Sequence, residues 1–283
     1  MTIITNIGEL VGIVPEGVLR KRGAEMDEVG SLKDAYLTIE GERISGFGNM
    51  SECPTAEPQN EVIDAEGGIV MPAFCDSHTH ICYAGTRERE FIDKINGLSY
   101  EEIAARGGGI LNSADLLHRT SEEELYSQTM TRVREMITKG TGAIEIKSGY
   151  GLTTEDELKM LRVIRRVKSE SPATIKATFL GAHAVGRAFK GRQNEYVNLV
   201  CEEMIPAVTA EGLAEYVDVF CDEGFFTVDE TDRILSAGER YGLIPKIHAN
   251  ELACSGGVQV AVKHNALSVD HLERTTDAEI EAL

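Results

Sequence analysis

The chain is poor in positive charge and has no long apolar run. Its 28 lysines and arginines face 47 aspartates and glutamates, which gives a formal net charge of −19. Because an acidic chain of this size repels phosphate backbones, we expect no nucleic-acid partner. The longest apolar run, Ile81–Ala84, has four residues, whereas a membrane helix needs roughly 20. We therefore expect no membrane partner.

Paired cysteine motifs and a secretory signal are also missing. None of the six cysteines stands in a CxxC arrangement. In a chain of this length, that pattern is typical of reduced thiols rather than of a disulfide framework. The first residues, MTIITNIGEL, contain neither a basic n-region nor a long apolar h-region. We expect a soluble, cytoplasmic globular protein.

Two regions differ in their local pattern. In residues 1–67, β-prone segments at 35–40 and 43–47 flank a turn at Gly41 and predict a partial small β domain of the β-sandwich type. In residues 68–283, short apolar segments alternate with helical patterns, which indicates an α/β fold with a parallel sheet. The predicted strands are 69–75, 141–146, 174–180, 216–221, 244–247 and 268–270. The predicted helix starts are the capping boxes Ser99/Glu102, Ser121/Glu124, Thr154/Glu157, Thr227/Glu230 and Thr276/Glu279.

Polar side chains directly after these strands decide between a doubly wound open sheet and a (β/α)8 barrel. They are His78/His80, Lys147/Tyr150, His183, Asp222/Glu223, His248/Glu251 and His271. In a barrel the carboxyl ends of all strands surround one mouth, whereas an open sheet spreads them along an edge. We therefore predict a TIM-like barrel. Only about six βα units are present, so we interpret the chain as a fragment truncated before strands 7 and 8, with an incomplete fold as the alternative.

Two short motifs are candidates for metal chemistry. In His78-Thr79-His80 the two imidazoles are two residues apart, so on a strand they face the same side and can reach one ion. His248 at a strand end is followed by Glu251, a carboxylate that can carry protons beside a metal. Ordinary strand-end histidines and an exposed glutamate are the alternative interpretation.

Arg87 and a glycine run lie in the loops that follow the first predicted barrel strand. An arginine over the mouth can bind a substrate carboxylate through two parallel hydrogen bonds. Its neighbours Glu88, Arg89 and Glu90 equally allow a solvated ion cluster. The run Gly107–Gly109 lacks the Lys-Ser/Thr of a phosphate loop, so we expect a mobile turn or a lid hinge there.

Longer motifs occur in order along most of the chain. They are IDAEGGIVMPAFCDSHTH (63–80), AGTRERE (84–90), GGGI (107–110), EIKSGYGL (145–152), TFLGAHA (178–184), DVFCDE (218–223), HANE (248–251) and DHLE (270–273). The first resembles the opening of the amidohydrolase superfamily. The others, above all EIKSGYGL with TFLGAHA, resemble the imidazolonepropionase family of histidine degradation.

The resemblance implies a role for each matched residue. It implies that His78, His80 and His248 bind one Zn²⁺ or Fe ion. A single metal is expected because Cys221-Asp222 stands where binuclear relatives have a bridging lysine. Arg87 would bind the substrate's propionate, Tyr150 and His183 would contact the substrate, Glu251 would bind the ring and move its proton, and His271 would place the carbonyl or the attacking water. The aspartate expected after an eighth strand, a metal ligand and general base, would lie beyond Leu283.

The implied reaction is hydrolysis of the cyclic amide of 4-imidazolone-5-propanoate to N-formimidoyl-L-glutamate. Its partner would be a small carboxylate-bearing heterocycle, and the complete protein would be a homodimer. A nucleobase-deaminase-like amidohydrolase is the nearest alternative, since such enzymes share the HxH and HxxE features. Arg87 and Tyr150 favour a substrate with a carboxylate instead. A non-catalytic truncated remnant is the other alternative.

Overall fold

The computed structural model describes residues 1–98 and 109–283. These residues form two compact units, Met1–Ala73 and Phe74–Leu283. The predicted helix start at Ser99/Glu102 and the glycines at 107 and 108 lie outside the described residues. Within the described ranges, no helix combines the length and the apolar character needed to cross a bilayer. All six cysteines lie in these ranges and are free thiols.

The first unit is built on one five-stranded sheet. Its order is β3-β2-β1-β4, and β5 also pairs with β1. The hairpin predicted around Gly41 is confirmed, and this glycine has a φ of 61°, which a residue without a Cβ adopts easily. The elements are β1 (Thr2–Ile13), η1 (Gly23–Asp27), β2 (Gly30–Glu40), β3 (Arg43–Asn49), η2 (Met50–Glu52), β4 (Glu61–Asp64) and β5 (Ile69–Val70).

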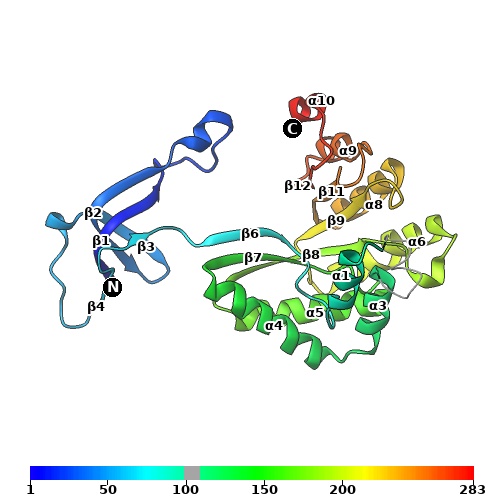
Figure 1. The fold of residues 1–283 in the computed structure, drawn as a ribbon, viewed down its shortest axis with the longest axis horizontal. Helices are drawn as coiled ribbons and strands as arrows, with labels where there is room; N and C mark the ends of the chain where they lie inside the picture. The colour runs from blue at the N-terminus through cyan, green and yellow to red at the C-terminus, as the bar shows by residue number, and fades with distance from the viewer. Residues whose placement is uncertain (99–108) are drawn as a thin grey trace. The chain divides into compact units, whose positions relative to one another are not determined.

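The second unit contains a curved parallel sheet with the order β6-β7-β8-β9-β11-β12. Figure 1 shows these strands following one another from cyan to orange. Strands that are consecutive in the chain are neighbours in the sheet, which is the order of a (β/α)8 barrel, and the predicted fold class is confirmed. The strands are β6 (Phe74–Thr79), β7 (Thr141–Lys147), β8 (Thr174–Ala182), β9 (Tyr216–Cys221), β10 (Ile244–Pro245), β11 (Ile247–Ala249) and β12 (Val269–His271).

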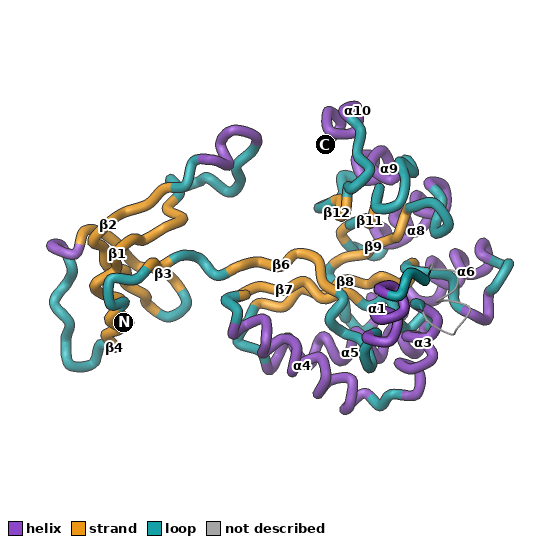
Figure 2. Tube along the Cα trace, in the orientation of Figure 1, coloured by secondary structure: helices purple, strands orange, loops and turns teal. Residues whose placement is uncertain are grey.

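Helices alternate with these strands (Figure 2). The described helices are α1 (Glu88–Ile95), α3 (Ile110–Arg119), α4 (Glu122–Thr138), α5 (Thr154–Glu170), α6 (Gln193–Leu199), α7 (Ile205–Ala210), α8 (Val228–Arg240), α9 (Gly257–Lys263) and α10 (Asp277–Ala282). A 3-10 helix η3 (Arg187–Phe189) precedes α6, and a π-helical turn η4 (Val200–Met204) joins α6 to α7. The core between helices and sheet includes Ile144, Phe179 and Val217 from strands and Leu161 and Ile164 from α5.

The prediction of the first barrel strand as 69–75 is wrong. Ile69–Val70 form β5, which pairs with β1 in the N-terminal sheet, and the barrel strand β6 begins only at Phe74. Pro72 lies between them and has no N–H to donate to a strand ladder. His78 consequently lies inside the strand, and His80 directly follows it.

Three of the predicted helix starts are confirmed, and one is wrong. Reciprocal capping boxes form at Thr227 and Thr276, and the Ser121 side chain accepts the N–H of Glu124. The Thr154/Glu157 box is wrong, because α5 is capped one residue earlier by Thr153, which accepts the N–H of Asp156. The carboxylate of Glu157 is instead buried beneath the loop that precedes the helix.

Candidate active site

The polar residues that follow the strands converge at the carboxyl ends of the sheet. A pocket of about 270 Å³ lies there, and it is lined by every predicted site residue except His78. The residues come from elements far apart in the chain: Arg87 caps α1, Tyr150 follows β7, His183 follows β8, and His248 and His271 lie on β11 and β12. Most of the polar residues expected around one mouth therefore line this pocket, whereas Lys147, Asp222 and Glu223 do not.

Three imidazoles form the centre of the site. The Nε2 atom of His80 lies 3.1 Å from Nε2 of His78 and 3.2 Å from Nε2 of His248. Nitrogens of all three rings lie within 4.8 Å of one another, and within the described ranges no other group of histidine, cysteine or acidic residues is arranged in this way. Three imidazole nitrogens that converge on one point are a donor set that suits a transition metal ion.

The strand end that carries the HxH motif is held by a neighbouring strand. Thr79, between the two histidines, donates its hydroxyl to the carbonyl of Glu145 at 2.6 Å. Its N–H also donates to the carboxylate of Glu145 at 3.3 Å. These bonds hold the chain between His78 and His80, whose Nε2 atoms lie 3.1 Å apart.

A buried ionic network lies beneath the histidines. Asp218 on β9 accepts from Nζ of Lys147 at 2.7 Å and lies 3.0 Å from Nδ1 of His248. Lys147 also donates to Glu145 at 2.8 Å, and Lys246 lies 3.4 Å from Glu145. Asp218 and Lys246 were not predicted as site residues. They could have been recognised as charged residues at inward-facing positions of otherwise apolar segments.

The network fixes the charge of its members. Burial alone would raise the pKa of Asp218, but attraction to His248 and Lys147 holds that pKa well below its usual range. Burial alone would lower the pKa of Lys147, but Asp218 and Glu145 raise it above its usual value. The pair is therefore an anion and a cation, which orient the Nδ1–H of His248 toward Asp218.

Burial lowers the pKa of three histidines of the site. It lowers the pKa of His80 well below its usual value, and repulsion from His183 and His248 adds to the effect. Burial, with repulsion from His248, lowers the pKa of His183 to about 3. The pKa of His248 is also lowered by burial, although Asp218 opposes the shift. Neutral imidazole is the form that binds a metal ion.

One side of the pocket presents a cation and a phenol. The Arg87 guanidinium lies 5.6 Å from the centre of the Tyr150 ring, within cation–π range. Its Nε donates to the hydroxyl of Ser113 at 3.0 Å, and its side chain is 43% exposed. The terminal nitrogens can therefore face an anion in the pocket. Burial raises the pKa of Tyr150, although Arg87 opposes the shift, so the phenol stays protonated at neutral pH.

The loop that carries Tyr150 is held from below by Glu157. The carboxylate of Glu157, fully buried, accepts the N–H groups of Gly149, Gly151 and Leu152 at 2.7–2.9 Å. A Cβ on Gly151 would lie 2.5 Å from the nitrogen of Glu157, so only glycine allows this approach. The glycines of this segment thus serve the backbone path around Tyr150.

The pocket also presents an acid next to a histidine. Oε2 of Glu251 lies 3.5 Å from Nδ1 of His271, at ion-pair distance. Asn250 (φ 57°), directly after β11, and His271 (φ 81°), the last residue of β12, have left-handed backbone conformations. Such conformations are uncommon outside glycine and concentrate at functional sites, where the surrounding structure holds them.

Two phenylalanines form an apolar part of the pocket lining. Phe220 and Phe225 lie with ring centres 4.0 Å apart, and Phe220 also contacts the rings of His183, His248 and His271. Both phenylalanines line the pocket. Neither was predicted from the sequence, because Phe220 in β9 cannot be told from core packing and Phe225 lies in the loop after that strand.

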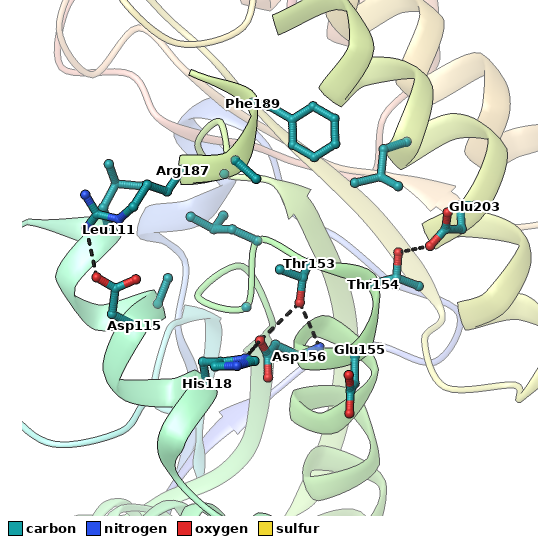
Figure 3. A pocket seen from close by; sticks show the side chains of 16 residues that line it. Leu111, Asp115, His118, Thr153, Thr154, Glu155, Asp156, Arg187, Phe189 and Glu203 are labelled. Atoms are coloured by element: carbon teal, nitrogen blue, oxygen red, sulfur yellow. Dashed lines mark hydrogen bonds and ion pairs between the residues drawn. The ribbon is translucent and has the colours of Figure 1, made fainter. Parts of the chain in front are cut away.

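A second hollow of about 740 Å³ holds none of the predicted site residues. Figure 3 shows its polar side chains already engaged with one another: Arg187 with Asp115, His118 with Asp156, and Thr154 with Glu203. The described residues provide no convergent metal donors there. The chemistry therefore concentrates in the smaller pocket.

Solved structures with a similar fold are metal-dependent hydrolases and deaminases. Guanine deaminase from C. acetobutylicum with bound guanine matches with a TM-score of 0.60 at 14% identity, over 99% of this chain and 64% of that chain. A triazine hydrolase matches with a TM-score of 0.61 at 13% identity, over 93% and 57%. This chain thus spans less than two thirds of either structure. At such identities the likeness shows the barrel fold alone.

Sequence comparison is more specific. No family model matches the chain. The imidazolonepropionase of Flavobacterium psychrophilum is 53% identical over 282 residues, which are 100% of this chain and 68% of the relative. That of Flavobacterium johnsoniae is 52% identical over 283 residues, 100% of this chain and 69% of the relative. The imidazolonepropionase of Myxococcus xanthus is 40% identical over 99% of this chain. On these grounds the chain belongs to the imidazolonepropionase family.

Proposed function

We propose that this chain carries the site for hydrolysis of 4-imidazolone-5-propanoate to N-formimidoyl-L-glutamate. Family membership indicates a hydrolase acting on a carbon–nitrogen bond. The observation that carries the proposal is the convergence of three imidazoles, a guanidinium and a carboxylate on one pocket of about 270 Å³. A heterocycle with one carboxylate has the polarity and dimensions that such a pocket suits.

The metal would be held by His78, His80 and His248. Their donor set fits: the three rings converge within 4.8 Å, and burial favours the neutral forms of His80 and His248. We propose one Zn²⁺ or Fe ion, because both accept imidazole ligands. When bound, the ion would activate water for attack on the ring carbonyl. Asp218 holds His248 by its Nδ1, which leaves Nε2 free for the ion.

Arg87 and Tyr150 would bind the substrate's carboxylate. Arg87 is anchored through Nε to Ser113, and its terminal nitrogens are hydrogen-bond donors. Its guanidinium can then donate to the propionate, while the neutral phenol of Tyr150 can donate a further hydrogen bond. Glu157 fixes the loop of Tyr150 from below. This side of the pocket therefore sets which end of the substrate faces the histidines.

Glu251 and His271 would handle protons at the ring. A carboxylate at the pocket wall can accept a ring N–H and return the proton to the departing nitrogen. His271, 3.5 Å from Glu251, can donate to the carbonyl oxygen or orient the attacking water. Phe220 and Phe225 provide a flat apolar wall for the ring between these groups.

A nucleobase-deaminase-like activity is not favoured, because Arg87 on the pocket provides a charge for which a neutral nucleobase has no partner. A location in the cytoplasm and a homodimeric assembly stay predictions from the sequence.

The purified chain, loaded with Zn²⁺ or Fe²⁺, tests the proposed function. We expect loss of imidazolone absorbance together with formation of N-formimidoyl-glutamate, and no ammonia from cytosine or guanine. His248→Ala should abolish turnover, whereas His118→Ala, at an exposed histidine outside the pocket, should leave it unchanged. Ammonia release from a nucleobase would support the deaminase alternative. Metal binding without any turnover would support a non-catalytic remnant.

A further inference from the structure

The buried carboxylate of Asp222, directly after β9, accepts hydrogen bonds from the backbone of the loop that carries Glu251. Asp222 is 4% exposed, and it accepts the N–H groups of Glu251 and Leu252 on Oδ2 at 2.8 and 2.9 Å. Its Oδ1 accepts the N–H of Ala253 at 3.1 Å and of Glu223 at 2.7 Å. Four amide donors thus surround one side chain.

The same loop is held from the opposite side by the segment after β12. The carbonyls of Ala249 and Asn250 accept the N–H groups of Leu272 and Arg274 at 3.1 and 2.8 Å. Between these two anchors Asn250 has the left-handed φ of 57°. A backbone in that conformation persists only where its surroundings impose it. Asp222 supplies one half of that restraint.

The groups that surround the Asp222 side chain are complementary to an anion. All four groups that face Asp222 are N–H donors, and an ionised carboxylate offers only acceptors. An amide in its place would turn an NH₂ group toward two of the donors. The loop would then have to move to relieve that contact.

We propose that Asp222 is a positioning residue that sets where the carboxylate of Glu251 stands in the pocket. The inference rests on the proposed function of Glu251. Asp222 does not line the pocket, so it acts on the substrate through the backbone of residues 251–253. It is not proposed to bind the metal, since its hydrogen bonds go to backbone amides, whereas Nδ1 of His78 lies 2.9 Å from Asp270 and Nδ1 of His248 lies 3.0 Å from Asp218.

The first test measures the loop without turnover. Hydrogen exchange is compared for a peptide covering residues 250–253 in the metal-loaded wild type and in Asp222→Asn, with Asp229→Asn, an exposed aspartate of α8, as control. We expect faster exchange in Asp222→Asn alone.

The affinity for imidazole propionate, which keeps the ring and the carboxylate but has no carbonyl to hydrolyse, is measured by calorimetry. We expect Asp222→Asn, Glu251→Gln and the double variant to bind equally weakly. Unchanged exchange would overturn the proposal.

The second test uses kinetics. Displacing a reacting group by about 1 Å costs on the order of 100-fold, so Asp222→Asn should lower kcat/KM by about 100-fold with metal content unchanged. In the Glu251→Gln background the same change should have little further effect. Loss of metal, or fully additive losses, would overturn the proposal. If Asp222→Asn does not fold, Asp222→Glu keeps the negative charge and is measured in the same ways. The proposed function would be refuted if the wild type bound imidazole propionate but did not turn over 4-imidazolone-5-propanoate. In that case the exchange and binding results would still decide the role of Asp222.

Discussion

Asp218→Asn tests whether the buried ionic network supports both the fold and the metal site. The substitution keeps the shape of the side chain and an oxygen for the Nδ1–H of His248, but it removes the negative charge that neutralises Lys147. Asp218 and Lys147 are fully buried, with Oδ2 and Nζ 2.7 Å apart. Both pKa directions show that the pair is ionised in the folded chain. The variant therefore leaves a buried cation with one carboxylate fewer.

The expected loss has two parts. Removing one partner of a buried ion pair costs about 3–5 kcal/mol. Because Lys147 keeps Glu145 at 2.8 Å, we expect the lower end, about 3 kcal/mol, in the metal-free chain. Weakening the carboxylate that orients a histidine ligand costs about 10- to 100-fold in metal affinity, which corresponds to about 1.4–2.8 kcal/mol. A saturating metal stabilises the folded state through its affinity, so the loss with metal should be about 4–6 kcal/mol.

Urea unfolding followed by far-UV circular dichroism measures both parts, since the chain has no tryptophan for fluorescence. The titration is run once with a chelator and once with excess Zn²⁺, and Asp229→Asn serves as the control. A loss below about 1 kcal/mol in the chelator would refute the account of the buried pair. An equal loss in both conditions would show that Asp218 does not orient His248 for the metal.

Three further substitutions test separate features. Arg87→Ala should raise KM sharply with metal content unchanged, since Arg87 lines the pocket without contacting the three imidazoles; unaltered kinetics would remove it from the site. His248→Ala should lower bound metal, measured by atomic absorption, to a small fraction of one equivalent, because two imidazoles remain. Burial raises the pKa of Asp156, but hydrogen bonds from Lys159 and His118 bring it below its usual 3.8. Its stabilisation is therefore complete above about pH 4 and is lost as pH falls through the lower pKa of the folded state. Asp156→Asn should flatten the dependence of the urea midpoint on pH below about pH 4, and an unchanged slope would contradict this sign.

The sequence alone determined the class of the fold and where its chemistry lies. Alternating strand and helix patterns predicted a parallel α/β sheet, and polar residues at strand ends predicted a common mouth. Both follow from local rules, because side-chain periodicity and capping depend on residues only a few positions apart. Where a stronger local constraint intervened, the prediction failed. Pro72 separated β5 from β6, and Thr153 capped α5 ahead of Thr154.

Only the tertiary structure decided how the side chains that support the site are arranged. Asp218 reaches His248 across 30 positions of the chain, and Asp222 reaches Ala253 across 31. Glu157 turned from a predicted helix cap into the acceptor for the Tyr150 loop. From the sequence alone, a carboxylate in a strand or in the first turn of a helix has many possible hydrogen-bond partners. Which distant N–H or ring it meets depends on the curvature of the sheet and the path of the loops, and these are properties of the packed chain as a whole.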